Sequence, residues 1–450
     1  MYGRAPIAAL ALASLAVLAG CGKSHSAQQI PQATPAELAA AGLAKGPVAP
    51  DGKRVDLDVP TFSHPTKITN PLFPIGDLPS AVLSGQVEGK PFHTETTLLP
   101  VTRIIEWNGN EIETLVSQYT AFLAGRIEEV ALDKYAQADD GSVWYFGEDV
   151  FDYRNGDIVS REGTWIAGPE HPPAMIMPAH PQVGDVYRSE NAPGLVFEEV
   201  TVKKVGVTVR GPTGRVVGAM IGSELHSDGT REDKTFAPGY GEFFTGGGGD
   251  VEAMAVAVPA DAAQGQVPPG LTTLSTLATH VLELTQSRRW STASRSVRQL
   301  QRAWVKASPR ERPPRIAAEM TRALADVSGG IARRDRPAAG SGAIEVARAA
   351  LDLELRYRSP ASVDRDRFVL WTRQVEVDAA ASDRGAVHGD VSALEWVRDR
   401  FALGLGPLDR TRLDTELTEL RALATDGGFG ELAREAARLR LAVSQAALTT

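Results

Sequence analysis

The sequence predicts an α+β protein with two domains, an antiparallel β sandwich or (half-)barrel followed by an α-helical bundle. In residues 60–258, Asn-Gly and Asp-Gly pairs separate runs rich in β-branched and aromatic residues, which is a strong hairpin signal. Beyond residues 259–270, a linker rich in Pro, Gly and Ala, the hydrophobic period changes from two to about 3.6 residues. We therefore expect strands before this linker and helices in residues 271–450.

The amino-terminal residues have the features of a bacterial secretory signal. Arg4 precedes an apolar run and polar residues follow it, so residues 1–20 are interpreted as a signal peptide. Residues 18–21, LAGC, resemble the lipobox of bacterial lipoproteins, which implies that Cys21 carries a diacylglycerol and a palmitate-type acyl chain. This resemblance predicts a lipid-anchored protein on the extracytoplasmic side of the cell membrane or the outer membrane. The alternative is an ordinary signal whose cleavage site happens to contain a cysteine.

Cys21 is the only cysteine in the 450 residues, so its lipidation would leave a mature body without a thiol. Disulfides, cysteine-based zinc sites, cysteine nucleophiles and haem attachment through a CxxCH motif are then excluded. Residues 21–59 are rich in Ala, Pro, Gln and Gly, and we expect them to form a flexible tether. No cofactor is predicted.

Turn signals place the hairpins of the β domain. We expect turns at Asn108-Gly109, Asp140-Gly141, Asn155-Gly156 and Asp228-Gly229. Apolar and polar residues alternate approximately in TETTLLPVTRII and EIETLVSQY, which predicts strands with one face in water. Several hairpins in succession favour an antiparallel sandwich or barrel.

Apolar stripes at helical spacing define the second domain, which we expect to be a bundle with short connections. The stripes are Leu274, Leu277, Val281 and Leu284; Ile316, Met320, Leu324 and Val327; Phe368, Trp371 and Val375; Leu413, Leu417 and Leu420; and Leu432, Ala436, Leu439 and Val443.

Charge differs between the two halves of the chain. Residues 271–450 contain 28 Lys and Arg against 23 Asp and Glu, whereas residues 1–270 contain 19 against 33. The opposite signs indicate two domains with different surfaces. A nucleic-acid partner is not expected, because an acidic β half in the envelope would neither attract nor meet one.

The β half is similar to a group of secreted or lipid-anchored bacterial proteins. The stretches that carry this resemblance lie between residues 68 and 245, and they are ITNPLFPIGDLPSAVL, YAQADDGSVWYFGEDVFDYRNG, MIMPAHPQVGDVYR and KTFAPGYGEF. The resemblance agrees with an extracytoplasmic location and implies no particular activity or catalytic residue.

Two stretches of the β half are candidate metal sites. Asp139, Asp140, Glu148 and Asp149 gather carboxylates near hairpin turns, and carboxylates are ligands for Ca²⁺. Their spacing does not match an EF-hand, and the alternative is a pair of solvated hairpin turns.

The second stretch contains His171, Met175, Met177 and His180, which combine imidazole and thioether groups suited to copper. The alternative is a proline-bounded loop whose methionines pack beneath it.

A basic helix is expected near residues 287–315. Arg295, Arg298, Arg302 and Lys306 share one predicted face, and Val297, Leu300 and Trp304 share another. A solvated face of a bundle helix is the simpler interpretation. The functional alternative is contact with anionic lipid or an acidic partner.

Motifs for catalysis are absent, including G-x-S-x-G and H-E-x-x-H. The first functional hypothesis is therefore a non-catalytic binding protein for a small apolar ligand or an envelope partner. The alternatives are an extracytoplasmic hydrolase with dispersed catalytic residues and a protein that binds Ca²⁺ or copper. An apolar cavity would favour the first hypothesis, and carboxylates, His or Ser gathered in one deep pocket would favour the hydrolase.

Overall fold

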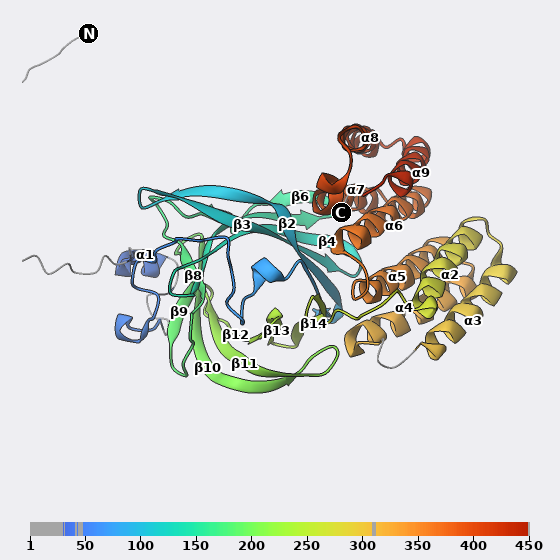
Figure 1. Cartoon of the computed structure of the whole chain (residues 1–450). Coiled ribbons are helices and arrows are strands. Elements are labelled where there is room, and N and C mark those ends of the chain that lie inside the picture. Colours follow the sequence, from blue (N-terminus) through green and yellow to red (C-terminus); the bar gives the residue numbers. More distant parts are fainter. Residues whose placement is uncertain (1–29, 31, 41–42, 44–47, 308–311, 449–450) are drawn as a thin grey trace, which may run out of the picture.

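The protein is described by a computed structural model, which covers residues 30, 32–40, 43, 48–307 and 312–448. The predicted signal peptide and Cys21 lie outside these residues. In the described part, a β half precedes a helical half, as the sequence predicts (Figure 1).

The β half is a single antiparallel sheet of 14 strands. The strands are β1 Ser80–Val87, β2 Lys90–Trp107, β3 Asn110–Leu123, β4 Arg126–Gln137, β5 Val143–Arg154, β6 Asp157–Ser160, β7 Trp165–Ile166, β8 Ala174–Met177, β9 Val186–Ala192, β10 Val196–Arg210, β11 Arg215–His226, β12 Arg231–Ala237, β13 Gly241–Gly247 and β14 Asp250–Val258.

The sheet curls into a half-barrel, one of the two predicted forms, and not into a sandwich of two sheets. The strand order is β6-β5-β4-β3-β2-β1-β14-β13-β12-β11-β10-β9, so the first long strand, β1, pairs with the last, β14. Strand β8 pairs with β5 and also contacts β9 at the opposite end of this order. The curled sheet therefore surrounds an interior, which Figure 1 shows almost end-on.

All four turns predicted from the sequence are confirmed. Asn108 and Gly109 have φ of 50° and 74° between β2 and β3, and Asn155 and Gly156 have φ of 53° and 80° between β5 and β6. Two successive positive φ values are the geometry that Asn-Gly favours, because Asn tolerates the left-handed region and Gly has no Cβ. The Asp-Gly pairs join β4 to β5 and β11 to β12.

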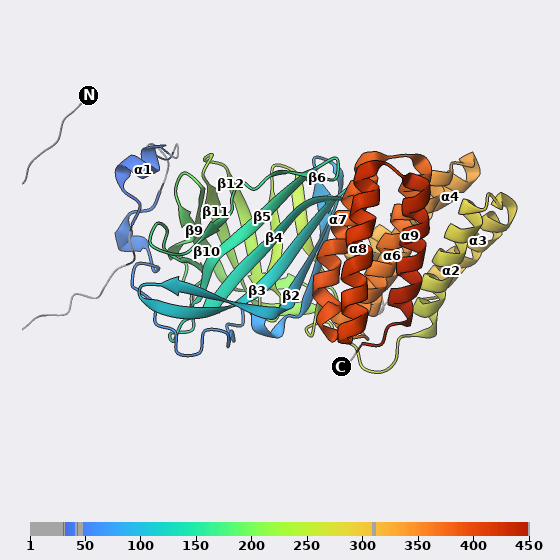
Figure 2. The ribbon, with the colours of Figure 1, turned by 90° about the horizontal axis from the view of Figure 1, so that it is seen from above.

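The helical half begins at Pro269 and packs beside the outer face of the sheet (Figure 2). Its helices are α2 Pro269–Gln286, α3 Trp290–Lys306, α4 Pro314–Arg333, α5 Arg336–Glu354, α6 Pro360–Ala381, α7 Arg384–Phe401, α8 Pro407–Asp426 and α9 Phe429–Gln445, with a short 3₁₀ turn η4 at Ala402–Gly404. None of the described helices combines the length and apolar character that a bilayer-spanning segment requires.

The two halves share hydrophobic cores. Val82 and Val256 of the sheet lie in one cluster with α2, α4 and α5, and Phe122 and Val130 lie in another with α6 and α7. The predicted linker is also fastened, because the buried Asp261 carboxylate accepts hydrogen bonds from Tyr240 Oη and Thr213 Oγ1, both at 2.8 Å. The helices therefore form part of the same packed body as the sheet.

The expectation of a wet face on β2 is confirmed only in the second half of the strand, where Ile104 and Glu106 are exposed, and it is wrong in the first half. Glu95 is 2% exposed and Thr97 is 3% exposed, although the TETT pattern predicts that such polar residues face water. In the first half of β2 the helical half covers this face, and arginines of α6 and α7 pair with Glu95. Period-two alternation identifies the two faces of a strand but not what covers each face.

Parts of the predicted tether are packed against the β half, whereas helix α1 (Pro35–Ala40) is mostly exposed. Ile30 is buried, and its N–H donates to Leu57 O at 2.8 Å. Arg54 and Asp56 are buried as an ion pair at 2.7 Å. Beyond them the chain, with the short 3₁₀ turn η2 at Ile75–Asp77, passes inside the curled sheet (Figure 1).

Candidate functional site: an acidic cavity inside the half-barrel

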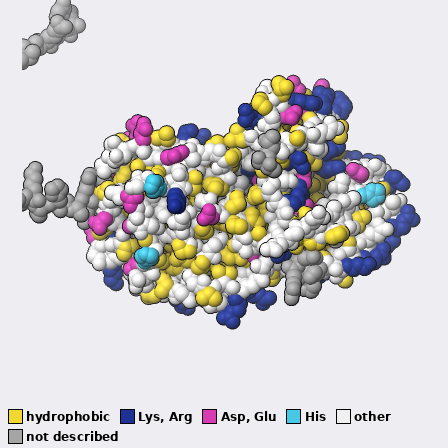
Figure 3. Space-filling model, in the orientation of Figure 1, with side chains coloured by type: hydrophobic (Ala, Val, Ile, Leu, Met, Phe, Trp, Pro, Cys, Tyr) yellow, Lys and Arg dark blue, Asp and Glu magenta, His cyan; other side chains and the backbone are white. Residues whose placement is uncertain are grey.

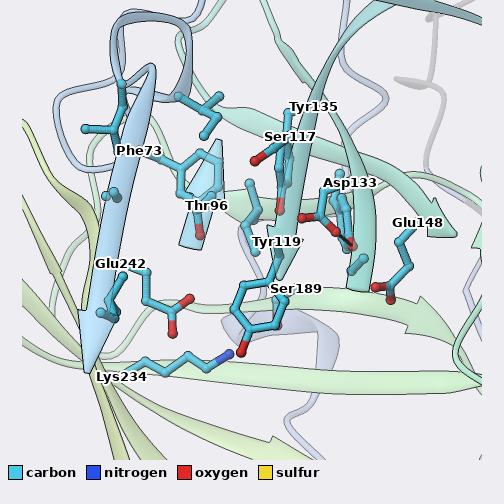
Figure 4. Close-up of a pocket in the computed structure, with 18 of the residues that line it drawn as sticks. Phe73, Thr96, Ser117, Tyr119, Asp133, Tyr135, Glu148, Ser189, Lys234 and Glu242 are labelled. Atoms are coloured by element: carbon cyan, nitrogen blue, oxygen red, sulfur yellow. Dashed lines mark hydrogen bonds between the residues drawn. The ribbon is translucent and has the colours of Figure 1, made fainter. Parts of the chain in front are cut away.

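The interior of the half-barrel contains a cavity of about 310 Å³. One wall is the inserted segment at residues 73–78, and the others come from strands on both sides of the sheet (Figure 4). Seven of its described lining residues carry a carboxyl group: Glu129, Asp133, Glu148, Glu190, Glu198, Glu242 and Glu252. Among those lining residues, Lys234 alone is a Lys or Arg.

Alternation along β4 explains how acidic side chains enter the interior. Glu129, Asp133 and Tyr135 line the cavity, whereas Val130 between them packs toward the helices. Because the period of a strand is two, odd-numbered residues from Glu129 to Tyr135 share the inner face. The run EEVALDKY therefore places two carboxyl groups, Glu129 and Asp133, on the inner face.

Asp133 and Glu148 form the polar wall near the tyrosines. Tyr145 Oη donates to Asp133 Oδ1 at 2.7 Å, and the Tyr135 ring stacks on Tyr145 with centroids 4.9 Å apart. Burial raises the pKa of Asp133 to about 6. Burial and the neighbouring Asp133 charge raise the pKa of Glu148 to about 8, so this carboxyl holds its proton at neutral pH.

Lys234 lines the cavity from strand β12. Its Nζ is 2.6 Å from Glu224 Oε2, and Ser189 Oγ donates to Glu224 Oε1 at 3.0 Å. Burial and the nearby Glu198 charge raise the pKa of Glu224 to about 8. Glu198 behaves oppositely, because Lys234 and His226 outweigh its burial and hold its pKa at about 2.

The third group of carboxyls lies toward β14. Burial and the charge of Glu242 raise the pKa of Glu252 to about 7, and Thr94 Oγ1 donates to Glu252 at 2.5 Å. Burial also raises the pKa of Glu129 to about 7. These shifts share a cause, which is that several carboxyl groups are withdrawn from water with too few cations beside them.

An unpartnered hydroxyl also faces this space. Ser117 is 1% exposed and lines the cavity, and its Oγ has no hydrogen-bond partner among the described residues. Figure 4 shows it beside Tyr135 on the cavity wall. Buried polar groups are nearly always paired, so this hydroxyl is available to a bound molecule.

The acidic residues proposed as a calcium site do not converge. Asp139 accepts hydrogen bonds from Thr61 Oγ1 and Ser63 N, both at 2.8 Å, and Asp140 accepts from Ser142 N at 2.9 Å. Both carboxylates thus hold turns together.

The other two members of that set lie on opposite sides of β5. Glu148 lines the cavity, whereas Asp149 forms an ion pair with Lys134 Nζ at 2.7 Å. Adjacent residues of a strand point to opposite faces, so these two carboxylates cannot share one ion.

The residues proposed for copper are also dispersed. Met175 and Met177 are buried in a hydrophobic cluster of the β half, whereas His180 is exposed and His171 is half-buried. The methionines pack as core residues, as the alternative predicts, but they belong to strand β8 and not to a loop.

The basic residues of α3 are exposed, as predicted. Arg295, Arg298, Arg302 and Lys306 face solvent, and the Val297, Leu300 and Trp304 stripe is buried in the helical core. In Figure 3, Lys and Arg side chains gather over the outer helices, at the end of the molecule farthest from helix α1 (Pro35–Ala40).

Among the site residues predicted from the sequence, Glu148 lines this cavity. Asp133, Glu190, Glu198 and Lys234 were missed, because they come from four strands that are distant in sequence. A usable signal was present in β4, where Glu129, Asp133 and Tyr135 repeat with even spacing inside a strand pattern.

Comparisons with known proteins give no further assignment. No family model matches the chain, and no curated protein matches it closely enough to count as a relative. The function is therefore argued from the geometry of the site.

Proposed function

We propose that this protein is a lipid-anchored envelope protein whose half-barrel binds a small organic cation. The observation that carries this proposal is the interior cavity with seven carboxyl groups and a single Lys in its lining. A cation placed among these groups would allow them to ionise without leaving the charge uncompensated. No catalytic step is needed for this role.

The cavity walls favour an amine with an alkyl or aromatic body. Carboxylates can receive an ammonium group, and the rings of Phe73, Tyr119 and Tyr135 offer apolar faces and cation–π contact. A wholly apolar ligand, as the sequence suggested, would desolvate the carboxyls further and return no hydrogen bond. The cavity thus supports a ligand with positive charge rather than an uncharged apolar one.

The envelope location rests on the lipobox-like residues 18–21. Two or more acyl chains hold a protein firmly at a membrane, since each buried CH₂ contributes about 0.8 kcal/mol. Cys21→Ser should therefore move the protein from the detergent phase to the aqueous phase in phase partitioning. Equal partitioning of the variant and the parent would rule out the anchor.

Calorimetry with the full chain tests the ligand class. Linear alkyl diamines should bind, and diols of the same length should not. Affinity should rise between pH 6 and pH 8 and binding should release protons, because the pKa values of Glu129, Glu148 and Glu252 are raised in the free cavity.

Two variants sharpen this test. Asp133→Asn removes a cavity charge and should weaken diamine binding by about tenfold, which corresponds to about 1.4 kcal/mol. Asp228→Asn, in an exposed turn, is the control and should leave the affinity unchanged. Diols that bind as well as diamines, or an Asp133→Asn variant with the parent's affinity, would contradict the proposal.

The hydrolase remains a second candidate on one observation. Glu198 and Glu224 have pKa values displaced in opposite directions, and both lie within 3.4 Å of Ser189 Oγ. Such a pair supplies a general acid and a general base at the same pH. Turnover of chromogenic esters or glycosides that is lost in Glu224→Gln would favour this candidate over simple binding.

A further inference from the structure

A second group of ionisable side chains lies at the junction between the sheet and the helices. His93 on β2, Glu319 on α4 and Asp352 on α5 each offer a ligand atom, and these atoms all lie within 4.8 Å of one another. The three residues line a cavity of about 270 Å³ between the start of β2, the β3–β4 turn and helices α4 and α5. This cavity is separate from the one inside the half-barrel.

The distances suit a tetrahedral metal ion. Two ligand atoms that each lie about 2.1 Å from a tetrahedral ion are about 3.4 Å apart. His93 Nδ1 and Glu319 Oε1 are 3.5 Å apart. The other ring nitrogen, His93 Nε2, faces Glu95 Oε1 at 3.6 Å, which is longer than a hydrogen bond. In metal sites this second nitrogen commonly faces a carboxylate.

Asp352 supplies an independent sign of a missing partner. This residue is 0% exposed, and one of its oxygens, Oδ1, accepts from Arg367 Nη2 at 2.6 Å. Its other oxygen, Oδ2, is buried and has no hydrogen-bond partner among the described residues. A buried carboxylate oxygen without a partner is costly, and a bound cation would satisfy it.

The carboxylates beside the cavity share few cations. Arg367 contacts Glu95, Asp352 and Asp364, and Arg400 contacts Glu95 and Asp364. Glu319 contacts His93, and Arg322 and Arg348 also line the cavity, where Arg348 is paired with Glu345 at 3.1 Å. A protonated His93 supplies one further positive charge, whereas a divalent ion on neutral His93 supplies two.

We propose that His93 Nδ1, Glu319 and Asp352 bind a divalent transition metal of the zinc class, with the fourth position open to the cavity. One imidazole and two carboxylates favour Zn²⁺ or a similar ion over Ca²⁺, which prefers oxygen ligands alone. The other described cluster of this kind, Glu198, Glu224 and His226, is less suitable because the Lys234 ammonium already contacts Glu224.

Calorimetry with ZnCl₂ on the chelator-treated full chain tests the site. One ion should bind per chain. Glu319→Gln should weaken binding by at least about tenfold, and because Gln has nearly the shape of Glu, this partly buried position should keep its packing. Asp326→Asn, an exposed carboxylate that lines the same cavity, is the matched control and should change the affinity less than about twofold. Co²⁺ in place of Zn²⁺ should give the parent the visible absorption of a tetrahedral site, and this absorption should be absent in Asp352→Asn.

The outcomes separate this proposal from the proposed function of the half-barrel. Asp133→Asn should weaken diamine binding and leave zinc binding unchanged, because it lies in the other cavity. No zinc binding by the folded parent, equal binding by Glu319→Gln, or zinc binding lost in Asp133→Asn would each overturn the metal site.

Discussion

Two regions of this molecule each gather several buried carboxyl groups, and the protonation of these groups differs between the regions. At the junction, Arg367 and Arg400 outweigh the burial of Glu95 and hold its pKa well below the ordinary range. In the half-barrel, burial raises the pKa of Glu148 to about 8, and no arginine lines the described cavity. A glutamate is therefore ionised at neutral pH at the junction, whereas a glutamate in the half-barrel keeps its proton.

The difference shows what each region is suited to do. The junction pairs its anions with arginines from α6 and α7 and thereby fastens the helices to the sheet. The half-barrel leaves its anions short of positive charge around an open volume. A paired network stabilises a contact, whereas an unbalanced one creates affinity for a cation.

Removal of an arginine from the junction should have the largest effect on stability. Arg400 Nε donates to Gln118 Oε1 at 2.6 Å and Nη2 to Thr120 Oγ1 at 2.8 Å, and Nη1 contacts Glu95. Arg400→Met leaves a buried anion underpaired and should lower the free energy of unfolding by about 3–5 kcal/mol. Denaturant titration measures this loss.

Arg398→Met on the same helix is the control, because Arg398 pairs with Asp414 at the surface. Its cost should be about 1 kcal/mol or less. If Arg400→Met costs no more than Arg398→Met, then the junction network does not hold the two halves together.

Neutralising a cavity carboxyl should have a smaller effect of the opposite sign. The folded state keeps the Glu148 proton that the unfolded chain loses above its pKa of about 4.5, so Glu148 lowers stability as the pH rises toward 8. Glu148→Gln should raise the free energy of unfolding at pH 9 by about 2 kcal/mol and change it little at pH 4.

The adjacent Asp149 provides the matched comparison, since it lies on the other face and pairs with the buried Lys134. Asp149→Asn should lower stability at pH 9, where Glu148→Gln raises it. Unfolding curves at the two pH values for both variants test this, and changes of the same sign would break the distinction between the two faces of β5.

Substitution of the exposed arginines should have the smallest effect. Arg295 and Arg298 on α3 face solvent, so Arg295→Gln and Arg298→Gln should each change the free energy of unfolding by about 0.5 kcal/mol or less. Thermal unfolding of the two variants provides the measurement. A larger loss would mean that the outer basic face makes contacts comparable with those of Arg400.

Local signals in the sequence predicted the elements of the fold. The Asn-Gly pairs marked turns because few other residues accept positive φ, and the Val297, Leu300 and Trp304 spacing identified the buried face of α3. Neither signal depends on what lies elsewhere in the chain.

The candidate sites depend on contacts between residues that are far apart in the sequence, so local patterns did not predict them. From the sequence alone, His93 and Glu95 belong to the solvent-exposed face of a strand. In the structure, residues of α4, α6 and α7 contact them. Glu190 and Glu148 meet only when the sheet curls, so that β8 pairs with β5 and also contacts β9. Alternation fixes which residues share a face, but only the curvature of the sheet makes that face an interior.

The pairing of β1 with β14 has a consequence for how the chain reaches this structure. Ala81 and Ala257 are partners across almost the whole β half, so the sheet cannot close until the last strand is available. Contacts of such long sequence separation form slowly, because a large loop must be ordered first. A chain that is delivered from its amino terminus would hold unpaired edges at β1 while the later strands emerge, and the helices that cover this region would arrive last. Maturation of the half-barrel is therefore expected to be limited by the arrival of residues 250–258 rather than by the formation of its individual hairpins.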